Sequence, residues 1–530
     1  MSVVTNLDEL LRQLTQKKTA APPTPSPANR PVAETHRAPA TPLSSPSRPF
    51  TLKPKPQSPE DTAPAMPALT KFAAPTSTEA SLDSDLQHLE VSTSSAKLTD
   101  GLAVGSAVAG NSPAFIPQAP KDLSGAGLNA SEVTSIILKF LLNTGVESGY
   151  RTAGQLGLRF PIVEALLRDL KTEKLLIYKN SVAGGDYVYE LTDLGRERAR
   201  SLYAHCSYYG AAPVPLKQYI ASVSAQSLTL RRPTLQEIRK AFADLSLNEQ
   251  LIRDVGQAIH SGRGMFMYGA AGNGKTSIAS RISRAFGDSI WIPRAISAGG
   301  EIVRLYDPHR HELIPDVEVS VNGNDPTDGR WVHIHRPSVV VGGELQMENL
   351  EITIIRGSGI GEAPLQLKAN CGTLLIDDFG RQRMRTDDLL NRWIVPLENR
   401  HDYLHLESGR TIQVPFDQLL IFSTNLQPKD LVDEAFLRRI PYKIEVLSPT
   451  EVEFRALFLD SAVKLGFECT SSSVDYLMEK HYRFSNRPMR FCHPRDILRQ
   501  VENYCTLLET EKVVTKENLD RAVANYFSIM

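Results

Sequence analysis

The chain has 530 residues, which leaves room for three or four domains at about 150 residues each. It carries 59 Lys and Arg residues against 60 Asp and Glu residues, so its net charge of −1 indicates no polyanionic partner. Five cysteines without a C-x-x-C pair exclude a disulfide framework, and neither a signal peptide nor an apolar run of about 20 residues is visible. We therefore expect a cytoplasmic, multidomain protein with no membrane insertion.

The first part of the chain is rich in Pro, Ser and Ala. The first 120 residues hold 18 of the 35 prolines but three of the 37 aromatic residues. Such a segment buries too little apolar surface to offset its chain entropy, so we expect residues 1–127 to form a disordered tail. Four leucines with helical spacing predict a short helix at its start: Leu7, Leu10, Leu11 and Leu14. That helix either docks on a partner or is a fraying terminus with no role.

Residues 128–206 show the pattern of a small α+β domain. Apolar residues at helical spacing lie between residues 133 and 141, and a further helix is expected to begin near Pro161. Two strand-like runs follow, joined through Gly184 and Gly185, and Thr192 is placed to cap a last helix. Helix, helix, helix, hairpin and closing helix is the element order of a winged helix, and residues 189–199 resemble the stretch after the wing in that family.

DNA binding by this domain is a separate question. The helix expected to enter a DNA groove is apolar at its start, whereas three basic residues lie on the closing helix: Arg196, Arg198 and Arg200. Both DNA recognition and a role in docking protein or spacing an oligomer remain open. Residues 207–235, which contain several prolines, are expected to form a linker.

The most specific motif in the chain is a complete phosphate-binding loop, G-x-x-x-x-G-K-S/T. It lies between an apolar strand-like run and a helical segment. The backbone N–H groups of such a loop surround phosphates at the positive end of the helix. Lys275 is expected to reach the β- and γ-phosphates of ATP, and the Thr276 hydroxyl to bind Mg²⁺. The predicted nucleotide-binding residues of this loop are Gly269, Ala270, Ala271, Gly272, Asn273, Gly274, Lys275 and Thr276.

A second signal is an apolar run that ends in two acids, Asp377 and Asp378. Asp377 is expected to hold Mg²⁺ through water, and Asp378 to polarise the water that attacks the γ-phosphate. The alternative is that Asp378 only orders the end of its strand, since acids are common at that position.

Together, the phosphate loop, the acidic strand end, a later strand that ends in Asn425 and a helical C-terminus resemble a AAA+ ATPase module over residues 236–530. The resemblance implies an α/β nucleotide-binding subdomain at residues 236–446 and a helical lid at residues 447–530. The family usually has Glu where this chain has Asp378, which is one methylene shorter and is compatible with slow hydrolysis.

The same resemblance implies roles for four further residues. Asn425 matches the sensor-1 position, where a polar side chain aims the attacking water. Arg438 and Arg439 lie in the segment that presents an arginine finger to a neighbouring subunit, and Arg495 matches the lid arginine that touches the γ-phosphate. The alternatives are interface salt bridges for the first two arginines and a surface position for Arg495.

The 102 positions from Lys275 to Asp377 leave room for a β-rich insertion at about residues 290–360. Strand-like runs flank Gly299 and Gly300, which predicts a hairpin, and others lie at 331–335, 338–341 and 350–355. Residues 367–377 resemble the lead-in of enhancer-binding activators and magnesium chelatases, which also carry insertions here.

Two smaller features of the insertion leave alternatives open. The glycine-rich run at residues 357–361 predicts either a pore loop or a plain glycine turn. Four histidines, at positions 309, 311, 333 and 335, have strand spacing that suits metal chelation, but no third ligand is visible and exposed strand histidines are common.

The ordered chain is also similar to a bacterial group of predicted ATPases with chaperone activity that is associated with Flp pilus assembly. The similarity lies in residues 343–351, 375–382, 389–398 and 421–440. We therefore expect a Mg²⁺-dependent ATP hydrolase that forms a homo-oligomeric ring, expected to be a hexamer, and remodels a macromolecular partner. The alternatives are a nucleotide-gated transcription or DNA-binding regulator and a slowly hydrolysing ATP switch or scaffold.

Overall fold

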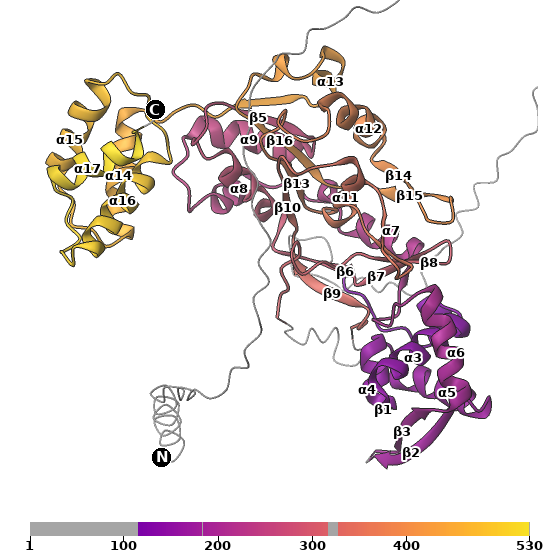
Figure 1. Cartoon of the computed structure of the whole chain (residues 1–530). Coiled ribbons are helices and arrows are strands. Elements are labelled where there is room, and N and C mark those ends of the chain that lie inside the picture. Colours follow the sequence, from indigo (N-terminus) through magenta and orange to yellow (C-terminus); the bar gives the residue numbers. More distant parts are fainter. Residues whose placement is uncertain (1–114, 183, 316–326, 529–530) are drawn as a thin grey trace, which may run out of the picture. The chain divides into compact units, whose positions relative to one another are not determined.

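The structure is a computed structural model that describes residues 115–182, 184–315 and 327–528 (Figure 1). All of these belong to one unit of the chain, residues 93–530. The expected N-terminal helix and most of the expected tail lie outside the described residues. Within the described residues, no helix has both the length and the apolar composition needed to cross a membrane.

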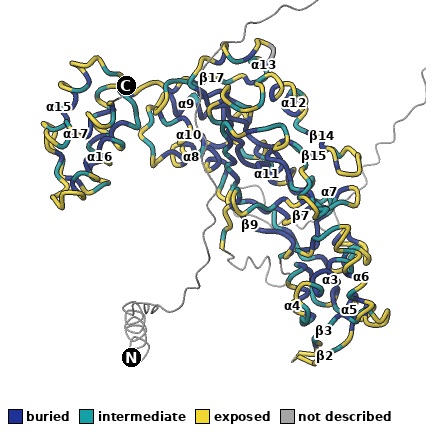
Figure 2. The backbone as a smooth tube through the Cα atoms, in the orientation of Figure 1, coloured by how far each residue is buried: buried dark blue, intermediate teal, exposed yellow. Residues whose placement is uncertain are grey.

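A five-stranded parallel sheet forms the centre of residues 236–446, as expected. Its strand order is β10–β13–β16–β5–β17, and every neighbouring pair runs parallel. The bounds are Met265–Tyr268 for β5, Ser338–Val341 for β10, Thr373–Ile376 for β13, Leu419–Thr424 for β16 and Tyr442–Glu445 for β17. Strands β13 and β16 are buried along their whole length, because helices cover both faces of a parallel sheet (Figure 2).

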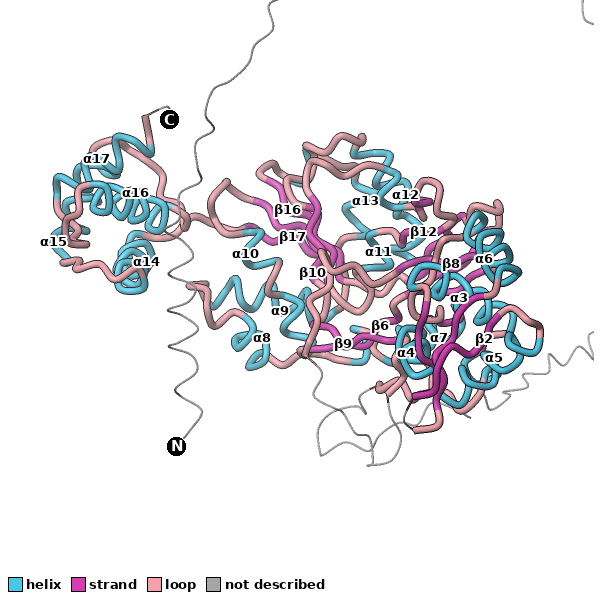
Figure 3. Tube along the Cα trace, turned by 60° about the horizontal axis from the view of Figure 1, so that its bottom comes forward, coloured by secondary structure: helices cyan, strands magenta, loops and turns pink. Residues whose placement is uncertain are grey.

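Alternate residues of the central strands pack into two different apolar clusters. In β5, Met265 and Met267 join the cluster that includes α8 (Leu235–Ala241), α9 (Glu249–Ser261) and α10 (Lys275–Ala279). Phe266 points to the other face, where α12 (Thr386–Asn399) and α13 (Glu434–Arg439) contribute Trp393 and Phe436. The two-residue period of the strands thus places one helical layer on each face of the sheet (Figure 3).

The β-rich insertion is present, with two corrections. β7 (Ala295–Ala298) and β8 (Glu301–Arg304) form the expected hairpin through the glycine pair, but β6 (Ser289–Pro293) pairs instead with β9 (Trp331–His335). The run at residues 338–341 is β10 and lies in the central sheet, so its assignment to the insertion is wrong. Local strand propensity predicts that a segment is extended but does not choose its partner.

The glycine-rich run at residues 357–361 forms a turn in the hairpin of β11 (Thr353–Ile355) and β12 (Ile360–Glu362). The Ser358 carbonyl accepts a hydrogen bond from the Ser207 backbone N–H at 2.8 Å. A side chain at Gly359 would lie 2.2 Å from the His205 carbonyl oxygen. This run is therefore packed against residues 205–207, which favours the glycine turn over the pore loop.

The N-terminal domain contains the expected elements in the expected order. Its helices are α3 (Ala130–Thr144), α4 (Gly149–Leu156), α5 (Phe160–Thr172) and α6 (Asp193–His205), and its hairpin is β2 (Leu176–Val182) with β3 (Asp186–Leu191). A short strand that the sequence did not predict, β1 (Val146–Ser148), pairs with β3. Thr192 caps α6 by accepting a hydrogen bond from the Gly195 backbone N–H at 3.0 Å.

The expected linker and the last part of the expected tail are ordered, so both expectations are wrong there. Residues 207–235 contain β4 (Val214–Pro215), which pairs with β7, and α7 (Leu216–Ala225), whose Tyr219 and Val223 are buried among strands of the insertion. Residues 115–127 contain the short helix α2 (Leu123–Ala126). A buried ion pair of 2.8 Å joins Arg330 to Asp328. Arg330 also donates to the Ala126 carbonyl and so holds residues 115–127 in place.

The C-terminal lid is helical, as expected. It consists of α14 (Glu451–Lys464), α15 (Ser471–Leu477), a π-helical segment (Met478–Arg483), α16 (His493–Leu507) and α17 (Lys516–Tyr526). Thr450 and Glu453 cap α14 reciprocally, and the four helices enclose their own apolar cluster.

Candidate nucleotide-binding site

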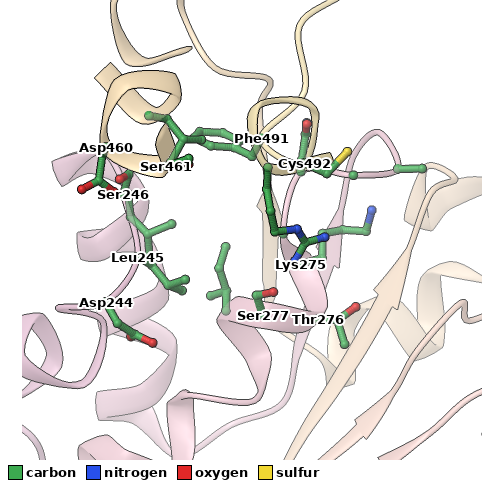
Figure 4. A pocket seen from close by; sticks show the side chains of 18 of the residues that line it. Asp244, Leu245, Ser246, Lys275, Thr276, Ser277, Asp460, Ser461, Phe491 and Cys492 are labelled. Atoms are coloured by element: carbon green, nitrogen blue, oxygen red, sulfur yellow. The ribbon is translucent and has the colours of Figure 1, made fainter. Parts of the chain in front are cut away.

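A cavity of about 610 Å³ lies between the phosphate loop, the ends of β13 and β16, residues 244–247 and the lid. Its size falls within the range of small-molecule sites, about 300–1,000 Å³. Figure 4 shows Asp460, Ser461 and Phe491 of the lid on one side of the cavity and Asp244 and Ser277 on the other. Residues 271–276 of the phosphate loop, Asp377, Asp378, Asn425 and Arg495 all line this cavity.

The phosphate loop follows β5 directly and leads into α10, whose first residue is Lys275. Two of its glycines are required by the space around them. Gly269 has φ +132°, and a Cβ there would lie 2.6 Å from the Val446 carbonyl oxygen. Gly272 has φ +80°, and a Cβ there would lie 2.5 Å from the Sγ atom of Cys492. The loop can therefore lie close to Val446, which follows β17, and to Cys492 of the lid, because it carries no side chains at these two positions.

The Lys275 ammonium group is buried and donates three hydrogen bonds. Its acceptors are the carbonyl oxygens of Gly269 at 2.9 Å and Ala270 at 3.1 Å, and Oδ1 of Asn425 at 2.6 Å. Burial lowers the pKa of Lys275, while the carboxylates of Asp377 and Asp378 act in the opposite direction. The ammonium group thus contacts the phosphate loop and Asn425 at the same time.

Thr276 and Asp377 are brought together as the sequence predicts. The Thr276 hydroxyl donates to Oδ2 of Asp377 at 2.7 Å, and the Asp377 backbone N–H donates to the Val341 carbonyl at 2.7 Å. A hydroxyl and one carboxylate suit Mg²⁺, which usually takes one or two carboxylates and completes its octahedron with phosphate oxygens and water. Among the described residues, no group of three or more His, Cys, Asp or Glu side chains forms an all-protein metal site.

Asp378 is held by Asn425. The Asn425 amide nitrogen donates to Oδ1 of Asp378 at 3.3 Å, so one asparagine bridges Lys275 and the second acid. Asp378 has φ +48°, a left-handed conformation that Asp and Asn adopt more readily than longer side chains. The left-handed backbone at position 378 thus favours Asp over the longer Glu.

The lid contacts the phosphate loop through the residues just before α16. The Cys492 backbone N–H donates to the Gly272 carbonyl at 2.9 Å. Arg490 donates to Oγ of Ser448 at 2.5 Å, and Asn273 of the loop donates to the same oxygen at 3.3 Å. Arg490 and Asn273 thus meet at Ser448, beside the phosphate loop.

Arg495, predicted as the lid arginine, lines the cavity, whereas Arg490 does not. The Arg495 guanidinium is 60% exposed and pairs with the Asp496 carboxylate at 3.1 Å. Sequence reasoning missed Arg490, because the resemblance aligns the lid arginine with the helix start rather than with the loop before it. It also missed residues 244–247 and the cavity-facing side of α14, which no local motif marks.

Arg438 and Arg439 lie outside this cavity, at the end of α13. Arg439 pairs with Glu398 at 2.7 Å, whereas Arg438 is exposed and forms no ion pair with the described residues. The two arginines therefore do not reach the nucleotide cavity of their own chain.

The histidine pairs of the insertion do not form a metal site among the described residues. His311 is buried, with Nδ1 accepting from the Asp307 backbone N–H at 3.1 Å and Nε2 lying 2.9 Å from the Lys368 carbonyl. Since backbone groups engage both ring nitrogens, His311 is not available as a ligand. His333 stacks on Trp291 with ring centroids 4.6 Å apart.

Comparison with known proteins gives a family match in the lid alone. Residues 450–525 match a family described as "Domain of unknown function (DUF8689)". No curated protein matches the chain.

Similar solved structures include the RuvB Holliday junction branch migration motor of Thermotoga maritima, which is 12% identical, with 56% of this chain and 74% of that chain covered and a TM-score of 0.31. NtrX from Brucella abortus in complex with ATP is also 12% identical, with 55% and 59% covered and a TM-score of 0.34. These TM-scores are too low to carry an argument, so the class rests on features of this chain. The features that agree with the AAA+ resemblance are therefore those of this chain itself: its parallel sheet, the phosphate-loop motif before α10, the acidic end of β13 and the helical C-terminal domain.

Proposed function

We propose that the chain binds Mg-ATP in the cavity and hydrolyses it. The observation that carries this proposal is the convergence of two hydrogen-bonded sets in one cavity: Thr276 with Asp377, and Lys275 with Asn425 and Asp378. These groups come from three separate segments, yet they supply the donors, the metal ligands and the carboxylate that phosphoryl transfer to water requires.

Each group has a distinct role in this proposal. Backbone N–H groups of the phosphate loop and the Lys275 ammonium bind the phosphates, and Thr276 and Asp377 hold Mg²⁺. Bound Mg²⁺ neutralises charge on the phosphate oxygens. Asp378 orients and polarises the attacking water, and Asn425 positions Asp378 by its hydrogen bond.

We further propose that hydrolysis requires a second copy of the chain. Arg438 lies outside its own nucleotide cavity and is exposed, and a guanidinium is always charged and matches phosphate oxygens. Arg439 is the weaker candidate, because its Nε donates to Glu398. A homo-oligomeric ring, expected to be a hexamer, is the arrangement that the AAA+ resemblance implies for such an arginine.

Remodelling of a protein partner, in the manner of a chaperone-like motor, and a link to pilus assembly remain proposals from the resemblance. We also propose that residues 128–206 are a winged helix used for docking, since their elements occur in that order. The regulator alternative, in which this domain binds DNA, gains no support from Arg196, which pairs with Glu190 at 3.3 Å and Asp193 at 3.8 Å.

A slowly hydrolysing switch is the second candidate function. The observation that favours it is the Asp378 side chain, which is one methylene shorter than the Glu that the AAA+ family usually has at this position. In this case ATP binding alone drives assembly, and turnover is low.

Phosphate release from Mg-ATP by the purified protein tests the proposal. We expect turnover in the wild type and none above background in Asp378→Ala, with ATP binding retained in both. Asp388→Ala, which removes an exposed carboxylate outside the cavity, is the matched control and should hydrolyse normally. Tight ATP binding without turnover in the wild type would favour the switch, and absence of ATP binding would contradict both candidates.

A further inference from the structure

A polar cavity of about 420 Å³ lies where the insertion meets the segment that follows α10. Its walls are residues 280–288, which include the 3₁₀ helix Ile282–Phe286, residues 310–312, and residues 335–338, which join β9 to β10. It shares no lining residue with the nucleotide cavity. Its volume falls within the range of small-molecule sites, about 300–1,000 Å³, so it can hold a ligand of its own.

The charged groups of this cavity are three guanidinium groups and two carboxylates. Arg284, Arg310 and Arg336 supply the cations, and Asp288 and Glu312 supply the anions. Both acids are exposed, and neither forms an ion pair with a described residue. Three serines and one histidine complete the polar lining: Ser280, Ser283, Ser338 and His335. The formal balance favours an anionic ligand, while the free carboxylates suit hydroxyl groups as hydrogen-bond donors.

Backbone carbonyl groups fix two of the three arginines. Nη1 of Arg310 donates to the Val340 carbonyl at 2.6 Å. Nη1 of Arg336 donates to the carbonyl groups of Cys371 at 2.7 Å and Gln226 at 3.2 Å. Neither arginine forms an ion pair with a carboxylate among the described residues. Hydrogen bonds therefore orient both guanidinium groups and leave their charges without an anion.

The N–H groups that remain on these two arginines differ in access. Nε of Arg336 is fully buried without a hydrogen-bond partner, so a ligand cannot reach it. Nη2 of Arg336 and both Nε and Nη2 of Arg310 also have no partner in the part of the chain that the structure describes, but they are not fully buried. These accessible groups are the donors that a ligand can use. Burial also lowers the pKa of Arg336, because a desolvated cation without an anion is unfavourable.

An ion pair connects this cavity with the nucleotide cavity. Nη1 of Arg284 lies 3.7 Å from Oδ1 of Asp244, and Asp244 lines the nucleotide cavity. Oδ2 of Asp244 accepts a hydrogen bond from Nε of Arg281 at 2.7 Å, so Arg281 holds the carboxylate when Arg284 moves. An anion that attracts Arg284 would therefore leave more negative charge of Asp244 uncompensated beside the nucleotide.

We propose that this cavity is an effector site for a small phosphate ester that carries hydroxyl groups. The guanidinium groups of Arg284, Arg310 and Arg336 bind the phosphate, and the carboxylates of Asp288 and Glu312 accept hydrogen bonds from the hydroxyl groups. Occupation of the site draws Arg284 from Asp244 and weakens ATP binding. This last step rests on the proposed function, whereas binding of the phosphate ester does not.

Binding of ribose 5-phosphate to the full-length Lys275→Ala variant tests the site without an intact phosphate loop. We expect calorimetry to show binding that falls at least about 10-fold when Arg284→Gln and Arg310→Gln are added, a pair that leaves the half-buried Arg336 in place. Adding Arg232→Gln and Arg356→Gln instead removes the same charge from exposed positions outside both cavities and should change the affinity less than about twofold.

The two carboxylates distinguish a phosphate ester from free phosphate. We expect ribose 5-phosphate to bind more tightly than inorganic phosphate, and ribose alone to show no binding. Asp288→Asn with Glu312→Gln should tighten inorganic phosphate binding by removing like-charge repulsion, and so reduce the preference for the ester. Equal affinities for the ester and inorganic phosphate in the unchanged cavity would contradict the ligand class.

The effector role is tested in the chain with an intact phosphate loop. Saturating ribose 5-phosphate should weaken binding of a non-hydrolysable ATP analogue by about twofold to fivefold, since an exposed ion pair couples the sites. Arg284→Gln should abolish this effect, whereas direct competition in the nucleotide cavity would persist in that variant and would contradict the effector role.

Failure of this proposal is separate from failure of the proposed function. A chain that binds no ATP would contradict the proposed function, yet ribose 5-phosphate binding to Lys275→Ala would stand. Absence of that binding, or binding that ignores the changes at Arg284 and Arg310, would overturn the site itself. Ester binding with unchanged affinity for the ATP analogue would overturn the effector role.

Discussion

The Lys275 ammonium group donates a hydrogen bond of 2.6 Å to Oδ1 of Asn425, whose amide nitrogen donates in turn to Asp378. The residue expected to bind phosphate and the residue expected to polarise water therefore share one partner. If the proposed function holds, a phosphate oxygen bound to the ammonium would compete with Asn425, and this one side chain would then couple occupation of the phosphate site to Asp378.

The first prediction concerns nucleotide affinity. Lys275→Ala should weaken ATP binding at least about 100-fold, because the variant loses charge-assisted hydrogen bonds of about 1.5–3 kcal/mol each. Calorimetry with a non-hydrolysable ATP analogue measures the effect. Lys429→Ala, an exposed lysine outside the cavity, is the control and should bind normally. Equal affinity in the two variants would show that the phosphate loop is not the nucleotide site.

The second prediction concerns the short second acid. Asp378→Asn keeps the left-handed backbone and an acceptor for Asn425, so ATP binding should persist while turnover falls about 100-fold or more. Asp378→Glu should also reduce turnover, since a longer side chain is less well tolerated at φ +48°. Steady-state phosphate release measures both variants. Normal turnover in Asp378→Asn would mean that the acid only orders its strand end, and faster turnover in Asp378→Glu would favour the switch.

The third prediction separates the two lid arginines. Arg490→Gln should weaken ATP binding about 10-fold, because Arg490 shares Ser448 with Asn273 of the phosphate loop, and Arg495→Gln should weaken it less, because its exposed guanidinium is already paired with Asp496. The loss should disappear when AMP replaces ATP as the ligand, since AMP lacks the outer phosphates. A larger loss in Arg495→Gln would restore the assignment made from the resemblance.

The fourth prediction concerns acid sensitivity of the lid. His493 is buried at the start of α16, and burial lowers its pKa from 6.5 to about 4, with the positive charges of Arg490 and Arg487 adding to the effect. The unfolded lid binds the proton more tightly than the folded lid. The contribution of neutral His493 to the free energy of unfolding of the lid is therefore fully present above pH 6.5. It is lost as the pH falls toward 4, by about 2 kcal/mol at pH 5.

Hydrogen exchange in α16 at pH 7.5 and pH 5, corrected for intrinsic rates, measures this loss. His493→Phe keeps the ring packed against Tyr526 and Phe527 but removes the titration, so its protection should change less with pH than that of the wild type. Equal acid sensitivity in the two proteins would assign the effect to other groups.

The part of the site that the sequence predicted consists of contiguous motifs. The phosphate loop and the acidic strand end are local patterns whose chemistry follows from a few residues in order, and the structure brings Thr276 and Asp377 to 2.7 Å. Asn425 was predicted from a resemblance, and its position at the end of β16 follows from the pairing of that strand with β5 and β13. Their catalytic roles remain predictions.

The parts that the sequence did not predict depend on tertiary contacts. Arg490 lies beside the phosphate loop because the Cys492 backbone N–H donates to the Gly272 carbonyl, which holds the segment before α16 against that loop. The proline content of residues 207–235 predicts a linker, but Tyr219 and Val223 of α7 are buried against strands far away in the sequence. In both cases the deciding partner lies many residues away, where local pattern carries no information.

The measurement that tests the central claim most directly is ATP turnover per chain over a range of protein concentrations, with Arg438→Ala beside the wild type. The account predicts that turnover per chain rises with concentration, because Arg438 acts on the nucleotide of a second copy. It also predicts a loss of about 1,000-fold or more in Arg438→Ala with binding intact, and a smaller loss in Arg439→Ala. Turnover per chain that is independent of concentration and unchanged in both arginine variants would contradict the account.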